Sequence, residues 1–110
     1  MNKKEIRFLF KQKVFKRDDY SCAYCNKHYG IDNANEFLDA HHITNREEMP
    51  NGGYVVENGI SLCKLDCHIK AEKFHITNHM EWEEGLHPDE LYSRIKSSKE
   101  LAYHKSIELK

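Results

Sequence analysis

Side chains that can bind metals or move protons gather between residues 37 and 72. His41 and His42 adjoin at the end of an apolar stretch, and Glu72 follows His68 by one helical turn. A cation that must also bind a substrate needs two or three nitrogen or oxygen ligands and open positions. His41, His68 and Glu72 offer such a set. His42 would then be free as a base, because the adjacent cation would keep its imidazole neutral.

The four cysteines form two close pairs, Cys22-x-x-Cys25 and Cys63-x-x-x-Cys67, the second one residue longer than a usual zinc knuckle. We therefore expect a structural Zn²⁺ on these four thiolates. A redox Cys-x-x-Cys would prefer a βαβ setting, which the pattern lacks. Two disulfides would need an oxidising compartment, and the sequence shows no export signal. Unrelated buried thiols would not be expected to fall into two close pairs.

The composition is that of one small folded domain. The chain has 110 residues, of which 39% are hydrophobic and 32% charged, with a mean hydropathy of −0.83. A domain of this size buries a limited core, so a structural metal would help to hold it together. No apolar run is long enough to span a membrane, and the first residues lack the features of a signal peptide. We expect a cytoplasmic protein that has no membrane contact.

Charge is nearly balanced overall but uneven along the chain. There are 17 basic and 18 acidic residues, yet residues 1–17 hold seven basic residues against Glu5 alone. Such an arm can steer a polyanion to one face, although a solvated amphipathic helix explains the charge equally well. Lys70 and Lys73 point away from the face shared by His68 and Glu72 and are available to phosphates. The expected nucleic-acid-binding residues are Lys11, Lys13, Lys16, Arg17, Lys70 and Lys73.

Periodicity predicts the elements that position these groups. Residues 3–17 form a helix capped by Asn2, with an apolar stripe of Ile6, Leu9, Phe10 and Val14. Residues 36–43 and 55–63 form an antiparallel hairpin around a glycine turn, and a helix begins near residue 67. Further helices follow Pro88 and Ser97 in a tail over residues 86–110. Strict alternation would put His41 and His42 on opposite strand faces, so a shared site requires the strand to bend or end there.

The segments Asp39-Ala-His-His-Ile43, Asn58-Gly-Ile-Ser-Leu-Cys63 and Cys67-His68 resemble the HNH endonuclease family in order and spacing. The resemblance covers about residues 20–76, and the cysteine pairs match the zinc-stapled subgroup. It implies an α+β fold with a ββα-metal (His-Me finger) core, a four-cysteine zinc knuckle and flanking N- and C-terminal helices. Residues 1–110 would then be a single nuclease domain.

The resemblance also implies residue roles. His42 is the general base, His41 and His68 are metal ligands, and Asn58 ties down the loop and orients the base. Glu72 stands where the family often has histidine, and a carboxylate there favours Mg²⁺ or Mn²⁺.

The implied activity is metal-assisted hydrolysis of phosphodiester bonds in DNA, with 5′-phosphate and 3′-hydroxyl products. A non-catalytic zinc module that binds DNA or protein is the rival hypothesis. It explains the cysteines and the basic helix but gives His41, His42, Asn58 and His68 no joint role. A nuclease that acts on RNA is a weaker rival.

Overall fold

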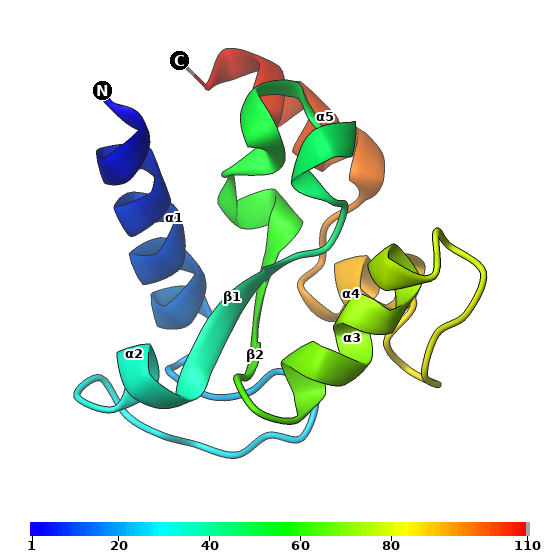
Figure 1. Ribbon diagram of the computed structural model, residues 1–110. Helices are drawn as coiled ribbons and strands as arrows, with labels where there is room; N and C mark the ends of the chain where they lie inside the picture. Colours follow the sequence, from blue (N-terminus) through cyan, green and yellow to red (C-terminus); the bar gives the residue numbers. More distant parts are fainter. Residues whose placement is uncertain (110) are drawn as a thin grey trace.

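The structure, a computed structural model, describes residues 1–109 and has an α+β fold (Figure 1). A two-stranded antiparallel hairpin lies between helix α1 on one side and helix α3 on the other. No helix within residues 1–109 is long and apolar enough to cross a membrane. The elements in order are α1 (Lys3–Arg17), α2 (Ala34–Phe37), β1 (Leu38–His42), the short 3₁₀ turns η1 (Arg46–Glu48), η2 (Pro50–Gly53) and η3 (Val56–Asn58), β2 (Gly59–Cys63), α3 (Cys67–Ile76), α4 (Pro88–Arg94) and α5 (Lys99–Glu108).

The hairpin is shorter than its sequence pattern predicts. β1 pairs with β2 so that Leu38 lies opposite Cys63 and His42 opposite Gly59. The predicted start of the first strand is the short helix α2, where Phe37 stacks on Tyr29 with ring centroids 5.3 Å apart. The predicted start of the second strand is the turn η3, which closes when the Asn58 amide donates to the Val55 carbonyl at 2.9 Å. Periodicity missed both because aromatic packing and a local turn outweigh strand propensity there.

Helix α1 begins as predicted, with the Asn2 Oδ1 atom accepting from the Glu5 amide at 2.9 Å. Its buried residues are Phe10, Val14 and Phe15, which pack on the hairpin. The predicted stripe was therefore placed partly on the wrong face, since Leu9 is 37% exposed. α1 approaches β2 closely at Gly59, where a Cβ would lie 2.6 Å from Val14 and 2.7 Å from Phe10.

The tail contains α4 and α5, and α5 packs on η2 and η3. The N-cap of α5 is Ser98, whose side chain accepts from the Leu101 amide at 3.0 Å. From the sequence, Ser97 with Glu100 would be expected to cap this helix, but the Ser97 hydroxyl instead donates to the Glu57 carbonyl at 2.9 Å. The tail thus closes over the long connection between the strands.

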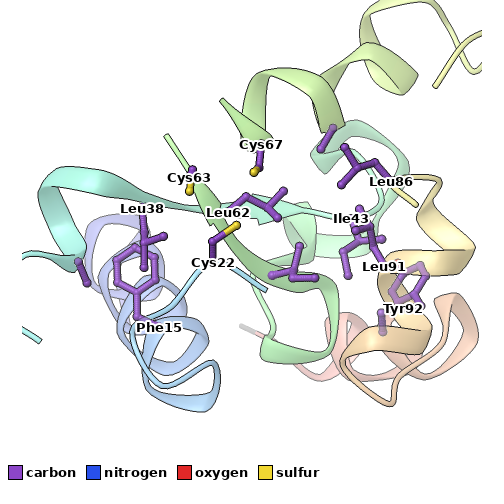
Figure 2. Close-up of a cluster of buried hydrophobic side chains, with 14 of the residues drawn as sticks. Phe15, Cys22, Leu38, Ile43, Leu62, Cys63, Cys67, Leu86, Leu91 and Tyr92 are labelled. Carbon is purple, nitrogen blue, oxygen red and sulfur yellow. The ribbon is translucent and has the colours of Figure 1, made fainter. Parts of the chain in front are cut away.

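The four cysteines converge at the edge of the hydrophobic core. Figure 2 shows Cys22, Cys63 and Cys67 among the buried side chains of this core, and Cys25 is exposed. All four are free thiols, and their sulfur atoms lie within 4.8 Å of one another, with Cys25 and Cys63 at 3.5 Å. Four thiolates around one zinc ion stand roughly 3.8 Å apart, given Zn–S bonds near 2.3 Å. Burial raises the pKa of the Cys63 thiol to about 11 and also raises that of Cys67, so a cation is needed to hold the thiolate forms. The cluster is therefore compatible with a structural zinc.

We expect the purified protein to hold one zinc ion on this cluster, and Cys63→Ser to lose both the ion and the cooperative unfolding transition. The physical reason is that binding free energy at a structural zinc site is folding free energy. Elemental analysis and thermal unfolding under reducing conditions measure the two effects. His68→Ala is the matched control, because it alters a different candidate metal site and should keep the zinc. Protein that folds without zinc contradicts this assignment.

Candidate active site

Three predicted metal ligands lie together between β1 and α3. His68 and Glu72 share one face of α3, with His68 Nε2 3.2 Å from Glu72 Oε1. His41 reaches the same carboxylate oxygen from β1, with its Nδ1 atom at 3.9 Å. One ligand atom from each residue lies within 4.8 Å of the other two. His41 is buried, and within residues 1–109 its Nδ1 atom has no hydrogen-bond partner. A buried nitrogen without a partner beside a carboxylate fits a bound cation.

The second nitrogen of His68 is held by Asp39. The distance between His68 Nδ1 and Asp39 Oδ2 is 2.6 Å, an arrangement that orients metal-binding histidines and makes them more basic. Burial acts to lower the pKa of His68, but its bonds to Asp39 and Glu72 outweigh burial and raise the pKa to about 9. Asp39 was not among the site residues predicted from the sequence. The available signal was its place two residues before His41, on the same strand face.

His42 ends β1, as a site shared by both histidines requires. Its ring stacks on Phe10 with centroids 4.7 Å apart and meets Tyr54 edge-on at 4.7 Å. Burial, followed by the positive charge of Arg46, lowers the pKa of His42 to about 4, so the imidazole is neutral at neutral pH. A pocket of about 200 Å³ is lined by His42 together with His68 and Glu72. The strand end therefore brings His42 and the metal cluster to one cavity.

Asn58 fixes the backbone just after His42. Its Nδ2 atom donates to the carbonyls of Thr44 at 3.0 Å and Gly53 at 3.2 Å, and its Oδ1 atom accepts from the Thr44 amide at 2.9 Å. Gly53 has φ +66°, and a Cβ there would lie 2.6 Å from the Asn58 Nδ2 atom, so the turn needs glycine. Tyr92 completes the network by donating its hydroxyl to Asn58 Oδ1 at 2.7 Å. Sequence reasoning missed Tyr92 because it lies in the tail, 34 residues away.

Arg46 is a third site residue, after Asp39 and Tyr92, that was not predicted from the sequence. It lines the pocket beside His42 and also a wider groove of about 570 Å³, whose wall includes Arg7 of α1. Tyr54 joins the two arginines. Arg46 Nη1 donates to the Tyr54 hydroxyl at 3.0 Å, and the Arg7 guanidinium lies 5.4 Å from the Tyr54 ring centroid. The groove therefore leads from the pocket along the start of the basic helix.

Three of the six predicted nucleic-acid-binding residues are engaged within the protein. Arg17 donates to the carbonyls of Val56 at 2.7 Å and Gly59 at 2.6 Å, and it forms an ion pair with Asp18. These contacts link the end of α1 to the hairpin. Lys70 pairs with Asp66 at 3.3 Å, and Lys73 lies 3.7 Å from Glu83 Oε1. Lys11, Lys13 and Lys16 lie on α1.

We expect His68 to titrate near pH 9 when only the cysteine cluster is loaded with metal, and Asp39→Asn to lower this pKa. Asp39 favours the charged imidazolium, so losing the carboxylate removes part of the stabilisation of the proton. Because the proton and a cation compete for His68, cation affinity should rise with pH up to about 9. Histidine NMR titration measures the pKa, and calorimetry measures the affinity. An unchanged pKa in Asp39→Asn contradicts the assigned pairing.

Comparison with known proteins finds one family model that is similar to the segment carrying these motifs. Residues 22–74 match the family model for HNH endonuclease. A search of curated proteins and a search of solved structures each gave no match to the chain. The matched segment includes all four cysteines, both strands, the three clustered ligands, His42 and Asn58. The match confirms the resemblance inferred from the sequence motifs: residues 22–74 are similar to the HNH endonuclease family.

Proposed function

We propose that the chain is an endonuclease that hydrolyses phosphodiester bonds in DNA, using one divalent cation and His42 as general base. The observation that carries this proposal is the shared pocket: neutral His42 opens on the same 200 Å³ cavity as His68 and Glu72, with His41 buried behind them. A base and a metal cluster that share one cavity are the two parts that phosphodiester hydrolysis requires. The match to the HNH endonuclease model supports nuclease chemistry of this kind.

His42 takes a proton from water in this proposal. Within residues 1–109 its Nε2 atom is buried and has no hydrogen-bond partner, which leaves Nδ1 as the nitrogen that a water in the pocket can reach. The depressed pKa keeps the imidazole neutral at neutral pH, and in the tautomer with its proton on Nε2 the Nδ1 lone pair is free to accept a proton. Asn58 does not touch the substrate. It holds the Thr44 backbone, and so the end of the strand that carries His42, in place.

The cation site would be formed by His41, His68 and Glu72, with Asp39 orienting His68. A divalent ion bound there supplies Lewis-acid activation and stabilises negative charge on the phosphate. The carboxylate favours Mg²⁺ or Mn²⁺ over softer ions. Arg46 lies at the rim of the same pocket, where its guanidinium can pair with a second phosphate oxygen.

The DNA backbone would follow the groove from Arg46 to Arg7 and on to the lysines of α1, of which Lys13 and Lys16 are exposed and Lys11 is half-buried. Contacts of this kind fix the position of the duplex without reading its sequence. Arg17 is left out of this surface because its guanidinium is already bound to Asp18 and two carbonyls. Lys70 and Lys73 would have to leave their acidic partners to contact phosphates.

We expect supercoiled plasmid to be cut in the presence of Mg²⁺ or Mn²⁺ and EDTA to stop the reaction. His42→Ala should lose about 10²–10⁴-fold in rate, which is the usual contribution of a general base, while keeping zinc content and DNA affinity. His104→Ala is the matched control, because this histidine is exposed on α5 and should cut at the parent rate. Gel assays of initial rates measure all three proteins.

Two outcomes contradict the proposal in different ways. A folded protein that cuts no nucleic acid with any divalent ion leaves the non-catalytic zinc module standing. A His42→Ala variant that cuts as fast as the parent refutes the assigned base even though the cutting is real. RNA tested in parallel with DNA decides the substrate class.

We also expect replacement of Lys11, Lys13 and Lys16 by alanine to weaken DNA binding and reduce its salt dependence. The slope of log K against log salt is negative, and each lost phosphate contact reduces its magnitude by about 0.9. A charge-matched control replaces Lys27, Lys96 and Lys99, which are exposed and lie outside α1. Binding titrations at several salt concentrations measure the slopes. Equal slopes for the two triple variants contradict a DNA-binding role for α1.

A further inference from the structure

A third group of potential metal ligands lies beside the candidate active site, with which it shares only His75, a residue that also lines the 200 Å³ pocket. Glu48 ends η1, His75 lies in the last turn of α3, and His79 lies in the turn that follows α3. One ligand atom from each of these residues lies within 4.8 Å of the other two. The Nε2 atom of His79 is 3.2 Å from Glu48 Oε2. Two imidazoles and a carboxylate form a common donor set for Zn²⁺.

His75 already has the tautomer that a metal ligand needs. Its Nε2 atom lies 3.1 Å from the carbonyl oxygen of His42, and a carbonyl only accepts, so Nε2 carries the proton. The Nδ1 atom therefore has the free lone pair in the neutral ring. Within residues 1–109 this Nδ1 atom is buried and makes no hydrogen bond. Metal-binding histidines characteristically donate their other N–H to a carbonyl or carboxylate in this way.

The turn after α3 directs His79 back toward this site. Asn78 and His79 have φ values of 54° and 73°, in the left-handed region that residues other than glycine rarely adopt. The turn is held by the His79 amide, which donates to the Phe74 carbonyl at 2.7 Å. The His79 ring stacks on Phe74 with centroids 4.5 Å apart and planes 10° apart. The imidazole is thus oriented by packing as well as by Glu48.

We propose that Glu48, His75 and His79 bind a second transition-metal cation, of the Zn²⁺ class, separate from the cysteine cluster and from the candidate catalytic ion. Three protein ligands leave a coordination position for water or another small ligand. A cavity of about 140 Å³ lined by all three residues gives room for it. The ion would accept the lone pair of the buried His75 Nδ1 atom. It would also replace the direct contact between Glu48 and His79.

Such an ion would join two elements that border the candidate active site. It would tie η1, which also carries Arg46, to the end of α3. It would also hold the His75 N–H on the carbonyl of His42, so that the backbone of this residue is anchored from a second side. The proposal concerns metal binding alone and does not depend on nuclease activity.

The test uses the full chain with zinc on its cysteine cluster, in a His68→Ala, Glu72→Ala background that removes the candidate catalytic ligands. We expect calorimetric titration with Zn²⁺ to show one further equivalent bound and thermal unfolding to shift upward with added Zn²⁺. Glu48→Gln and His79→Ala, each in that background, should weaken this binding at least about tenfold, or abolish it. Nitrogen NMR should place the metal on Nδ1 of His75 with Nε2 still protonated.

The matched control is a second histidine–glutamate pair, for which residues 1–109 offer no third ligand. His104 Nε2 lies 4.0 Å from Glu100 Oε1 on exposed α5, so Glu100→Gln and His104→Ala should leave the further equivalent intact. Zinc content of one ion per chain before titration shows that each variant has kept its cysteine cluster and fold. The proposal is overturned if the background protein binds no further equivalent. It is equally overturned if the combined Glu48→Gln, His79→Ala variant still binds it.

Discussion

The arrangement of the candidate site depends on the hydrogen bonds of the buried Asn58 side chain. Its side chain makes four hydrogen bonds, to the amide and carbonyl of Thr44, the carbonyl of Gly53 and the hydroxyl of Tyr92, while its backbone carbonyl accepts from Ile43. A primary amide offers two donors and two acceptor sites, so all are filled. Since an unpaired buried polar group costs about 1–3 kcal/mol, the network favours a single conformation of the segment after His42. The hairpin, the glycine turn and the tail helix α4 meet at this one side chain.

The cysteine cluster and the hydrophobic core contact different parts of the hairpin, and both stabilise it. The core packs Phe15 and Leu38 at one end and Ile43 and Leu91 at the other (Figure 2). The cysteines join the loop after α1 to the end of β2 and the start of α3. In a domain of 110 residues the core alone is limited, so a metal bound at this junction would fix where α3 starts. The direction of α3 in turn sets how His68 and Glu72 meet His41.

Most of the motif positions could be predicted from the sequence, because they depend on local order. The spacing of Cys22 and Cys25, and the single helical turn between His68 and Glu72, are properties of short segments. Tyr92 and Arg46 could not be assigned in this way. Tyr92 reaches Asn58 only because the tail folds back, and Arg46 reaches the pocket only because η1 turns toward it. A hydrogen bond across 34 residues leaves no periodic trace in a single sequence.

His68 differs from His41 and His42 in how readily its ring accepts positive charge. His41 and His42 are held neutral, chiefly by burial, which lowers their pKa values to about 3 and about 4. His68 is also partly buried, but the carboxylates of Asp39 and Glu72 raise its pKa to about 9. Positive charge is therefore stabilised between α3 and Asp39, and it is destabilised at the end of β1. A cation bound beside His68 and Glu72, with neutral His42 as the base, would match these two electrostatic environments. The opposite assignment would match neither.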